Sequence, residues 1–337
     1  MIQFRRDSLT KIAQPPAEAH AGLWLDKFFP GDDAQTAKAE HVKQVTKVSI
    51  PEAYTTFFRR WNQTLTSLGA DCRPFRTEGR LAVNLGAEGV LETSIALHRT
   101  YGMPYIPGSA LKGLAAHFVT EYFKDDPVWD VETRRYLFGD TTSAGYVTFY
   151  DALYMPGTGK GLVPDIITVH HPEYYQGAKP IYSQTLELAP PADWDSPTPI
   201  PFITVNGTFL LALSGPSDWV KAAFEVLELA LVREGVGAKT SSGYGRMEEA
   251  EIKIEYKTFK DASEIHIGDY FRGAVSEVEA KGINLSIPEL NPDDAQAYVA
   301  VDHPGRYQEG AVVRCKVVDI QTIGTYLRVI CELAKAK

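Results

Sequence analysis

The sequence is poor in cysteine, and none of its cysteines is placed as a metal ligand or a disulfide partner. Cys72, Cys315 and Cys331 lie far apart and form no C-x-x-C pair. Neither a disulfide framework nor a zinc knuckle is therefore indicated, and we expect the three thiols to be packed as small hydrophobic groups. No metal or other cofactor is expected.

Long apolar runs are also missing. No stretch approaches the roughly 18 consecutive apolar residues of a membrane-spanning helix. The first residues, MIQFRRDSLTKIAQPP, lack the apolar core of a signal peptide. These absences predict a cytoplasmic protein without a membrane partner.

An excess of positive charge is absent too, because the formal net charge is -9. This charge argues against a protein that coats nucleic acid non-specifically, since such binding is driven by phosphate neutralisation and counterion release. It leaves room for a local basic groove. With 337 residues, of which 44% are hydrophobic and 23% charged, the chain suits two or three soluble domains.

Residues 1–70 have a helical and polar pattern. A helix is predicted to start at Pro51 and to end at Gly69. Arg59 and Arg60 flank its apolar face and are expected to be solvated. That face repeats at spacings of three and four and comprises Tyr54, Phe57, Phe58, Trp61, Leu65 and Leu68.

From Gly79 onward the pattern alternates, which predicts two short strands over residues 81–85 and 91–97. A helix follows, with Ser109 as its expected N-cap. Lys112 lies in the first turn, where it would reinforce the N–H groups if an anion docked there; an exposed lysine is the equally simple alternative. The apolar stripe of this helix is Leu111, Leu114, Ala115, Phe118, Val119 and Tyr122.

Further strands are predicted over residues 145–153, 165–171 and 202–213, with a long excursion at 172–201. His170 and His171 are adjacent, which invites a metal interpretation. Successive strand residues point to opposite faces, however, so the two rings are poorly placed to bind one ion. A structural role or an RNA contact is the preferred interpretation.

Residues 233–247, REGVGAKTSSGYGRM, combine four glycines with a lysine, a Thr-Ser-Ser run, a tyrosine and two arginines. A helical stripe from Val220 to Leu231 precedes this loop, and Ile252, Ile254 and Tyr256 alternate after it, so the order is helix, loop, strand. Both the Walker loop and the dinucleotide fingerprint require the opposite order and different spacing. Glycines that permit close approach, together with lysine, hydroxyl and peptide N–H donors, predict a cradle for a nucleic-acid backbone. A long helix cap, for which Gly235 alone would suffice, is the structural alternative.

Three regions follow from these patterns: a helical N-terminal region at 1–70, a core at 71–258 and a C-terminal β domain at 262–337. The core suits βαββαβ units of the ferredoxin type. The last region has five short strands, which fit a small OB-like barrel. Acidic residues outnumber basic ones there, and both an interaction module and a single-strand RNA-binding module remain open. The predicted fold class is α+β.

Several segments resemble the RAMP superfamily of CRISPR-associated proteins and occur in that family's order across residues 51–256. The turn and helix start PGSALKG and the glycine loop form the pair that is typical of RAMP proteins. The HH-x-x-YY segment is similar to that of the sixth subunits of Cmr, or type III-B, effector complexes. The matching segments are ETSIALHRTYGMPYIPGSALKG, FGD followed by GYVTFYDA, DIITVHHPEYY and GVGAKTSSGYGRM. The C-terminal barrel-like region is a departure from the family.

The resemblance implies a ferredoxin-like, RRM-related core in a non-catalytic subunit for antiviral defence. Such a subunit caps the filament of backbone subunits near the 3′ end of the guide RNA. Its expected partners are the CRISPR guide RNA, other Cmr-type RAMP subunits and, as a further candidate, target RNA. The residues expected to contact RNA are Ser109, Lys112, Lys239, Thr240, Ser241, Ser242, Tyr244, Arg246, His98 and Tyr101.

Two enzymatic alternatives compete with this interpretation. RAMP relatives include metal-independent endoribonucleases that process CRISPR RNA, and His98, His170 and His171 have the chemistry for acid–base catalysis near neutral pH. No pairing of histidine with lysine or tyrosine compels that role. A nucleotide-binding enzyme is disfavoured by the failed phosphate-loop patterns.

Overall fold

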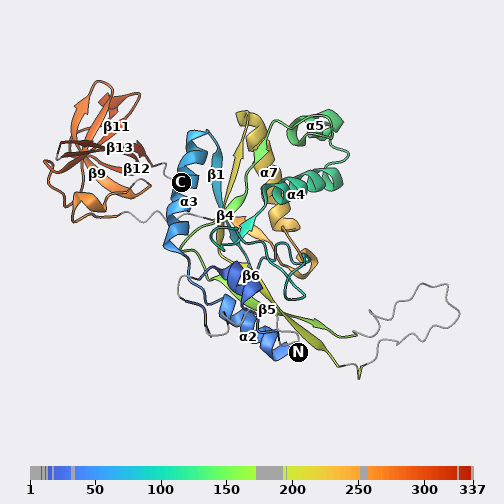
Figure 1. Ribbon diagram of the computed structural model, residues 1–337. Coiled ribbons are helices and arrows are strands. Elements are labelled where there is room, and N and C mark those ends of the chain that lie inside the picture. The colour runs from blue at the N-terminus through green and yellow to red at the C-terminus, as the bar shows by residue number, and fades with distance from the viewer. Residues whose placement is uncertain are drawn as a thin grey trace. The chain divides into compact units, whose positions relative to one another are not determined.

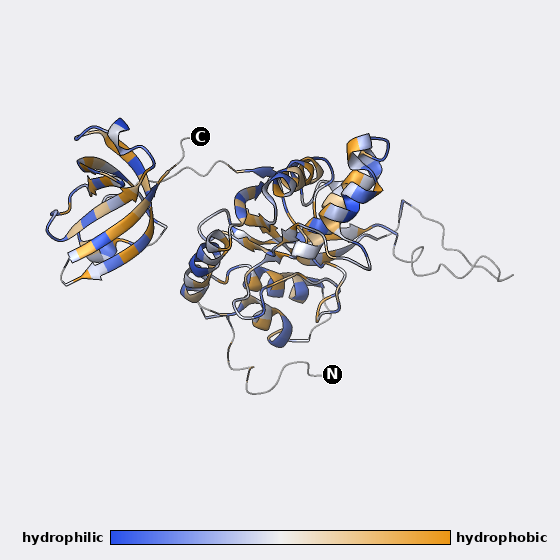
Figure 2. Ribbon diagram, turned by 90° about the horizontal axis from the view of Figure 1, so that it is seen from above, coloured by the Kyte–Doolittle hydropathy of each residue, from blue (hydrophilic) through white to orange (hydrophobic). Residues whose placement is uncertain are grey.

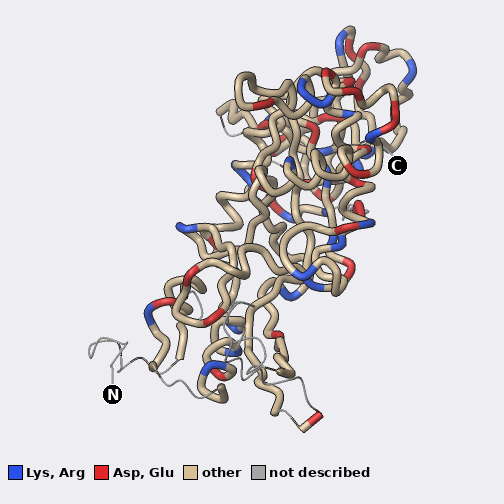
Figure 3. The backbone as a smooth tube through the Cα atoms, turned by 90° about the vertical axis from the view of Figure 1, so that its right-hand side faces the viewer, with Lys and Arg blue, Asp and Glu red and all other residues tan. Residues whose placement is uncertain are grey.

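The computed structural model describes residues 9, 12, 14–16, 19–31, 35–171, 193–194, 196–250, 257–266, 268–324 and 326–334. The chain divides into two compact units, Met1–Glu251 and Ile252–Lys337 (Figure 1). The first unit contains both the helical N-terminal region and the predicted core, and one hydrophobic cluster joins them. Figure 3 shows basic and acidic residues interspersed along the chain.

An antiparallel sheet organises the first unit, in the spatial order β2-β4-β7-β1-β8, and a short strand β3 also pairs with β7. All of its pairings are antiparallel. The strand β1, which has neighbours on both sides, was not predicted from the sequence, and its mid-strand Pro74 is unusual at such a position. Here β8 pairs with β1 only from Phe75 onward, so the missing N–H of Pro74 is tolerated. The strands are β1 (Asp71–Thr77), β2 (Tyr105–Ile106), β3 (Thr148–Phe149), β4 (Ala152–Tyr154), β7 (Thr208–Ser214) and β8 (Met247–Glu249).

Helices α4 and α7 lie side by side and contribute apolar faces to the core (Figure 1). The predicted stripe from Val220 to Leu231 on α7 is buried. The predicted stripe on α4 is largely confirmed, although Leu114 is half-buried and Tyr122 is exposed. The helices are α1 (Ala21–Lys27), α2 (Gln35–Val45), α3 (Glu52–Ser67), α4 (Gly108–Tyr122), α5 (Val131–Phe138) and α7 (Ser217–Arg233), and 3₁₀ turns span Pro127–Trp129 (η2) and Thr240–Ser242 (η3).

A separate two-stranded ribbon is formed by β5 (Gly161–Val169) and β6 (Thr198–Asn206). Its register runs without a break from Gly161 opposite Asn206 to Val169 opposite Thr198. The strand predicted over residues 202–213 is therefore two strands, β6 and β7, which meet at Gly207. An excursion was predicted over residues 172–201, and residues 172–192 of it lie outside the described part of the chain.

The strands predicted at 81–85 and 91–97 are wrong. This stretch is a loop in which only Leu81 and Leu97 make isolated bridges, to Val205 and Pro104. Its apolar side chains are nevertheless buried, since Leu81 and Val83 belong to the core. The alternation of apolar and polar residues therefore reflects burial of the apolar side chains, and it does not indicate strand pairing here. The strand predicted at 252–256 lies outside the described part of the chain.

The second unit is a closed five-stranded barrel in the order β10-β11-β13-β12-β9, as the five predicted strands indicated. In β11 the side chains alternate between the buried interior and a half-exposed exterior. Figure 2 shows that the barrel strands carry both hydrophobic and hydrophilic residues along their length. Cys315 and Cys331 lie in the interior, as expected, and burial raises the pKa of Cys315 to about 12. The strands are β9 (Tyr270–Glu279), β10 (Gly282–Ser286), β11 (Ala295–Ala300), β12 (Val312–Ile323) and β13 (Tyr326–Leu333), with 3₁₀ turns η4 (Ala262–Glu264) and η5 (Pro304–Arg306).

Among the residues that the structure describes, no helix is both long and apolar enough to cross a bilayer. Within the same residues, no group of three or more His, Cys, Asp or Glu side chains is placed to hold a metal ion.

Candidate nucleic-acid interface

The glycine loop begins where α7 ends at Arg233, and it returns the chain into β8. Its four glycines all have positive φ. At Gly245 an added Cβ would lie 1.9 Å from the Val236 carbonyl oxygen, and at Gly237 it would lie 2.3 Å from that of Ala82. The predicted positive φ values are confirmed, and what Gly245 and Gly237 approach closely is protein backbone.

Part of the loop backbone is already hydrogen-bonded within the protein. The Val236 N–H donates to the Gly245 carbonyl at 2.9 Å, the Ala238 N–H to Ala82 at 2.7 Å, and the Gly245 N–H to Arg80 at 2.8 Å. These three N–H groups are therefore not available to a ligand. These bonds hold the two ends of the loop in place.

The tip of the loop remains open. Lys239 has φ 60°, in the left-handed region, and leads into a 3₁₀ turn, η3, over Thr240–Ser242. Hydrogen-bond partners for the N–H groups of Lys239, Thr240 and Ser241 are absent from the described residues, as are partners for the two serine hydroxyls. Ser241 and Ser242 are exposed, and so is Arg246 just beyond the tip. These donors form a cluster that faces solvent.

A pocket of about 290 Å³ adjoins the tip, lined by Ser242, Gly243, Tyr244, Arg80 and Asp165. The Tyr244 hydroxyl donates to Asp165 Oδ2 at 2.7 Å, and Arg80 forms an ion pair with the same oxygen at 2.6 Å. The Tyr244 hydroxyl is therefore committed within the protein, although the sequence suggested it as an RNA contact. Its ring lies 6.2 Å from that of Phe202.

The Asp165 carboxyl is held in its charged form. Burial opposes ionisation, but the hydrogen bond from Tyr244 and the charge of Arg80 outweigh it and lower the pKa of Asp165. Burial and then the Asp165 carboxylate raise the pKa of Tyr244. Sequence reasoning missed Arg80 and Asp165, because only the folded chain brings them to residue 244.

The start of α4 differs from the prediction. Pro107 is its N-cap and Ser109 lies inside the helix, so Ser109 is not the cap. The Gly108 N–H donates to Asp151 Oδ1 at 2.8 Å. A carboxylate of the protein therefore occupies part of the anion position that the sequence suggested. Lys112 is half-buried one turn further on and has no ion-pair partner among the described residues.

His98 and Tyr101 lie on a second surface, against α3. The Tyr101 ring stacks on Phe57 at 4.8 Å, and the His98 ring lies 5.0 Å from Tyr101. Burial lowers the pKa of His98, His20 lowers it further, and Asp151 opposes both. Asp151 thus connects this aromatic group with the start of α4.

The structure therefore separates the predicted residues into two groups. One comprises Lys239 to Arg246 around the glycine loop, and the other comprises His98, Tyr101, Ser109 and Lys112. Within the described ranges, no hydrogen bond, ion pair or ring contact joins the two groups. His170 is exposed just beyond β5, with its ring 6.4 Å from that of His171; the tyrosines of the HH-x-x-YY segment lie outside the described residues.

Known proteins resemble this chain in sequence and in fold. A family model for the RAMP superfamily matches residues 69–248, more than half of the chain. A protein of Pyrococcus furiosus described as CRISPR system Cmr subunit Cmr6 is 33% identical over 265 residues, covering 60% of this chain and 76% of the relative. The Cmr6 subunit of Saccharolobus solfataricus is 26% identical over 167 residues, covering 49% of this chain and 51% of that protein.

A structural relative supports the fold. A chain in the cryo-EM structure of the Type III-B Cmr-beta complex bound to cognate target RNA superposes with a TM-score of 0.50 at 21% identity, covering 64% of this chain and 71% of that one. The RAMP match ends before the barrel, which begins at Tyr270. The chain therefore belongs to the RAMP superfamily, as a Cmr6-like member.

Proposed function

We propose that this chain is a non-catalytic, RNA-binding subunit of a type III-B CRISPR effector complex. In this role it caps the filament of backbone subunits near the 3′ end of the guide RNA. Guide RNA, target RNA and other Cmr-type RAMP subunits are its proposed partners, in the cytoplasm. Membership of the Cmr6-like family supports the assignment.

The proposal includes a ferredoxin-like, RRM-related core. Its support is the chain order β1, α4, β4, β7, α7, β8, combined with the spatial order β4-β7-β1-β8 and antiparallel pairing. That is a βαββαβ unit with two helices packed together. In such a unit the glycine loop connects the second helix to the last strand.

It also includes an OB-like C-terminal barrel. Five strands close in the order first, second, third, fifth, fourth, and the third and fifth strands, β11 and β13, pair in parallel. Five-stranded Greek-key barrels of this size bind oligonucleotides or proteins on their outer face. The barrel is a candidate second contact for RNA or for a neighbouring subunit.

The open tip of the glycine loop is the observation that carries the RNA-binding proposal. Unpartnered N–H groups, two exposed hydroxyls, Lys239 and Arg246 together suit phosphate oxygens. Asp165 lies nearby, but Arg80 neutralises it. Backbone contacts of this kind hold RNA in register and leave sequence reading to base pairing.

A salt titration of RNA binding tests this role. Lys239→Ala is expected to weaken binding of a labelled single-stranded RNA equally for all sequences and to reduce the salt slope by about one. Lys221→Ala is the matched control, because Lys221 is exposed near the opposite end of α7. If Lys239→Ala and wild type have the same RNA affinity and the same salt slope, Lys239 does not contact RNA and the proposed role of the loop is wrong.

Incubation with CRISPR repeat RNA tests the non-catalytic part. The packing of His98 against Phe57 and Tyr101, with its Nδ1 accepting from the Thr100 N–H at 3.2 Å, supports a structural imidazole. We expect intact RNA. Defined cleavage that is lost in His98→Ala would instead establish an endoribonuclease.

A further inference from the structure

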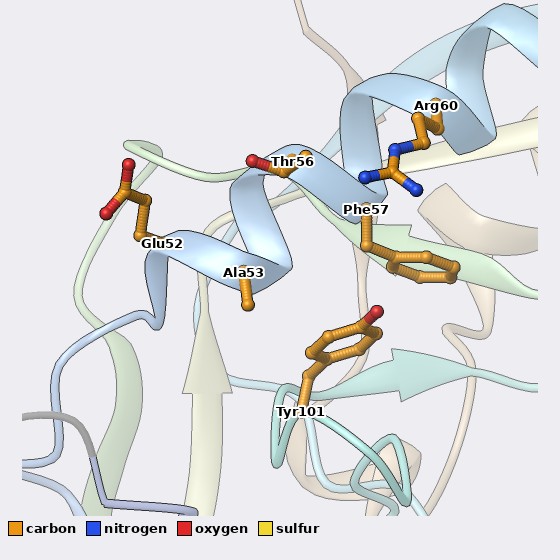
Figure 4. A pocket seen from close by; sticks show the side chains of 6 residues that line it. All are labelled: Glu52, Ala53, Thr56, Phe57, Arg60 and Tyr101. Carbon is orange, nitrogen blue, oxygen red and sulfur yellow. The ribbon is translucent and has the colours of Figure 1, made fainter.

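A groove of about 320 Å³ runs along α3, at the small end of the range for ligand pockets, which is about 300–1,000 Å³. Glu52, Thr56 and Arg60 are spaced by four residues and so form one stripe of the helix. Ala53 and Phe57 form the neighbouring stripe. Tyr101, from the loop before β2, is the opposite wall (Figure 4).

The middle of the groove is aromatic. Phe57 and Tyr101 are nearly parallel, with an interplanar angle of 28°, and Trp61 stacks on Phe57 at 6.5 Å and 21°. The rings of Phe57, Tyr101 and His98 are half-buried, so one side of the cluster faces the groove. Ala53, with its small side chain, leaves the helix surface open beside them.

The two ends of the groove carry opposite charges. Glu52 and Arg60 are both exposed, and neither has an ion-pair partner in the described part of the chain. They are eight residues apart, which is about 12 Å along a helix axis. A ligand in the groove therefore meets an acceptor at one end, a guanidinium donor at the other and rings between them.

We propose that this groove binds a guanine base of single-stranded RNA. The base stacks on the face of Tyr101 that Phe57 does not cover, its N1–H and N2–H₂ donate to the Glu52 carboxylate, and its O6 and N7 accept from Arg60. The inference rests on the proposed RNA-binding function and adds a base-reading contact to it. Stacking on aromatic rings is how proteins hold unpaired bases, and arginine with guanine O6 and N7 is the commonest specific base contact.

The chemistry of the groove selects this base. Uracil lacks an amino group for Glu52, and adenine has no O6 to accept from Arg60. An apolar side chain of a protein partner would stack on the rings but would leave both charged ends unsatisfied. A base with donors on one edge and acceptors on the other satisfies the rings and both ends.

The groove is also continuous with the second group of predicted RNA contacts. His98 packs on both Phe57 and Tyr101, and Asp151, which influences His98, accepts the N–H of Gly108 beside Ser109. Because burial lowers the pKa of His98, its ring is neutral near pH 7 and extends the stacking surface without adding charge.

Binding of two labelled RNAs to the full-length chain tests the inference: an oligouridine and the same oligouridine with one central guanosine. We expect the guanosine RNA to bind at least roughly fivefold more tightly. Arg60→Ala and Glu52→Gln are expected to remove that preference, whereas Tyr101→Phe retains it. Arg59→Ala is the matched control, because Arg59 is an exposed arginine of the same helix outside the groove.

A photo-crosslink gives a direct readout that does not depend on stability. With 6-thioguanosine at the central position, crosslinks are expected at Tyr101 or Phe57. Equal affinity for the two RNAs, or crosslinks only elsewhere, would overturn the inference while leaving backbone binding through Lys239 intact. If wild type binds neither RNA, the proposed RNA-binding function fails as well.

Discussion

At the scale of single residues, Asp165 anchors the tip of the glycine loop through Tyr244 and Arg80. Its pKa is lowered in the folded protein, so its ionised form contributes stability above the ordinary carboxyl pKa of about 3.9. That contribution is lost as the pH falls through the lowered folded-state value. We therefore expect Asp165→Asn to reduce the free energy of unfolding at neutral pH, and the difference from wild type to shrink below about pH 3.9.

Urea unfolding at a series of pH values measures this difference. Asp125→Asn provides the control, because Asp125 is an exposed carboxylate after α4. Tyr244→Phe removes one hydrogen bond to Asp165 and should show a smaller loss with the same pH dependence. A deficit in Asp165→Asn that stays constant into acid would mean that the ionised carboxylate is not the stabilising form.

At the scale of elements, the shape of the glycine loop depends on two glycines for different reasons. Gly243 has φ 85° with open space around it, whereas Gly245 combines φ 74° with a carbonyl 1.9 Å from an added Cβ. Gly243→Ala should lower the free energy of unfolding by about 1–2 kcal/mol, because alanine is strained in the left-handed conformation. Gly245→Ala should lower the free energy of unfolding by about 1–3 kcal/mol more than Gly243→Ala, because the backbone must also shift to separate the new Cβ from the Val236 carbonyl. Thermal unfolding compares the two variants, and equal losses would contradict the packed base of the loop.

Helices α3, α4 and α7 could be predicted because their apolar stripes are local and periodic. The barrel could be predicted from β-branched strands separated by turns. In contrast, β1 contains Pro74, which is tolerated because β8 pairs with β1 only from Phe75 onward. No local sequence pattern predicts where that long-range pairing begins. The groove on α3 also depends on a distant contact, between Phe57 and Tyr101.

At the scale of the whole molecule, the two units have separate hydrophobic cores. Each core is built from its own strands, so each unit should unfold in its own transition. A fragment of residues 1–251 is expected to melt within about 2–4 °C of the first unit in the full chain, the shift that 1 kcal/mol causes in a domain of this size. Calorimetry of the fragment and the full chain measures both midpoints. Independent folding would be contradicted if the full chain unfolded in a single transition and the fragment showed no cooperative transition.

Closure of the barrel has a consequence for how the chain meets other proteins. Each of its described strands has a neighbour on both sides, but β12 pairs with β9 only over Val312–Lys316, so the remainder of β12 is paired on one side, with β13. The sheet of the first unit ends at β2 and β8, two short strands. Within the described barrel, shared main-chain hydrogen bonds with another chain are therefore restricted to the region where β9 and β12 diverge, and elsewhere a partner meets side chains and loops.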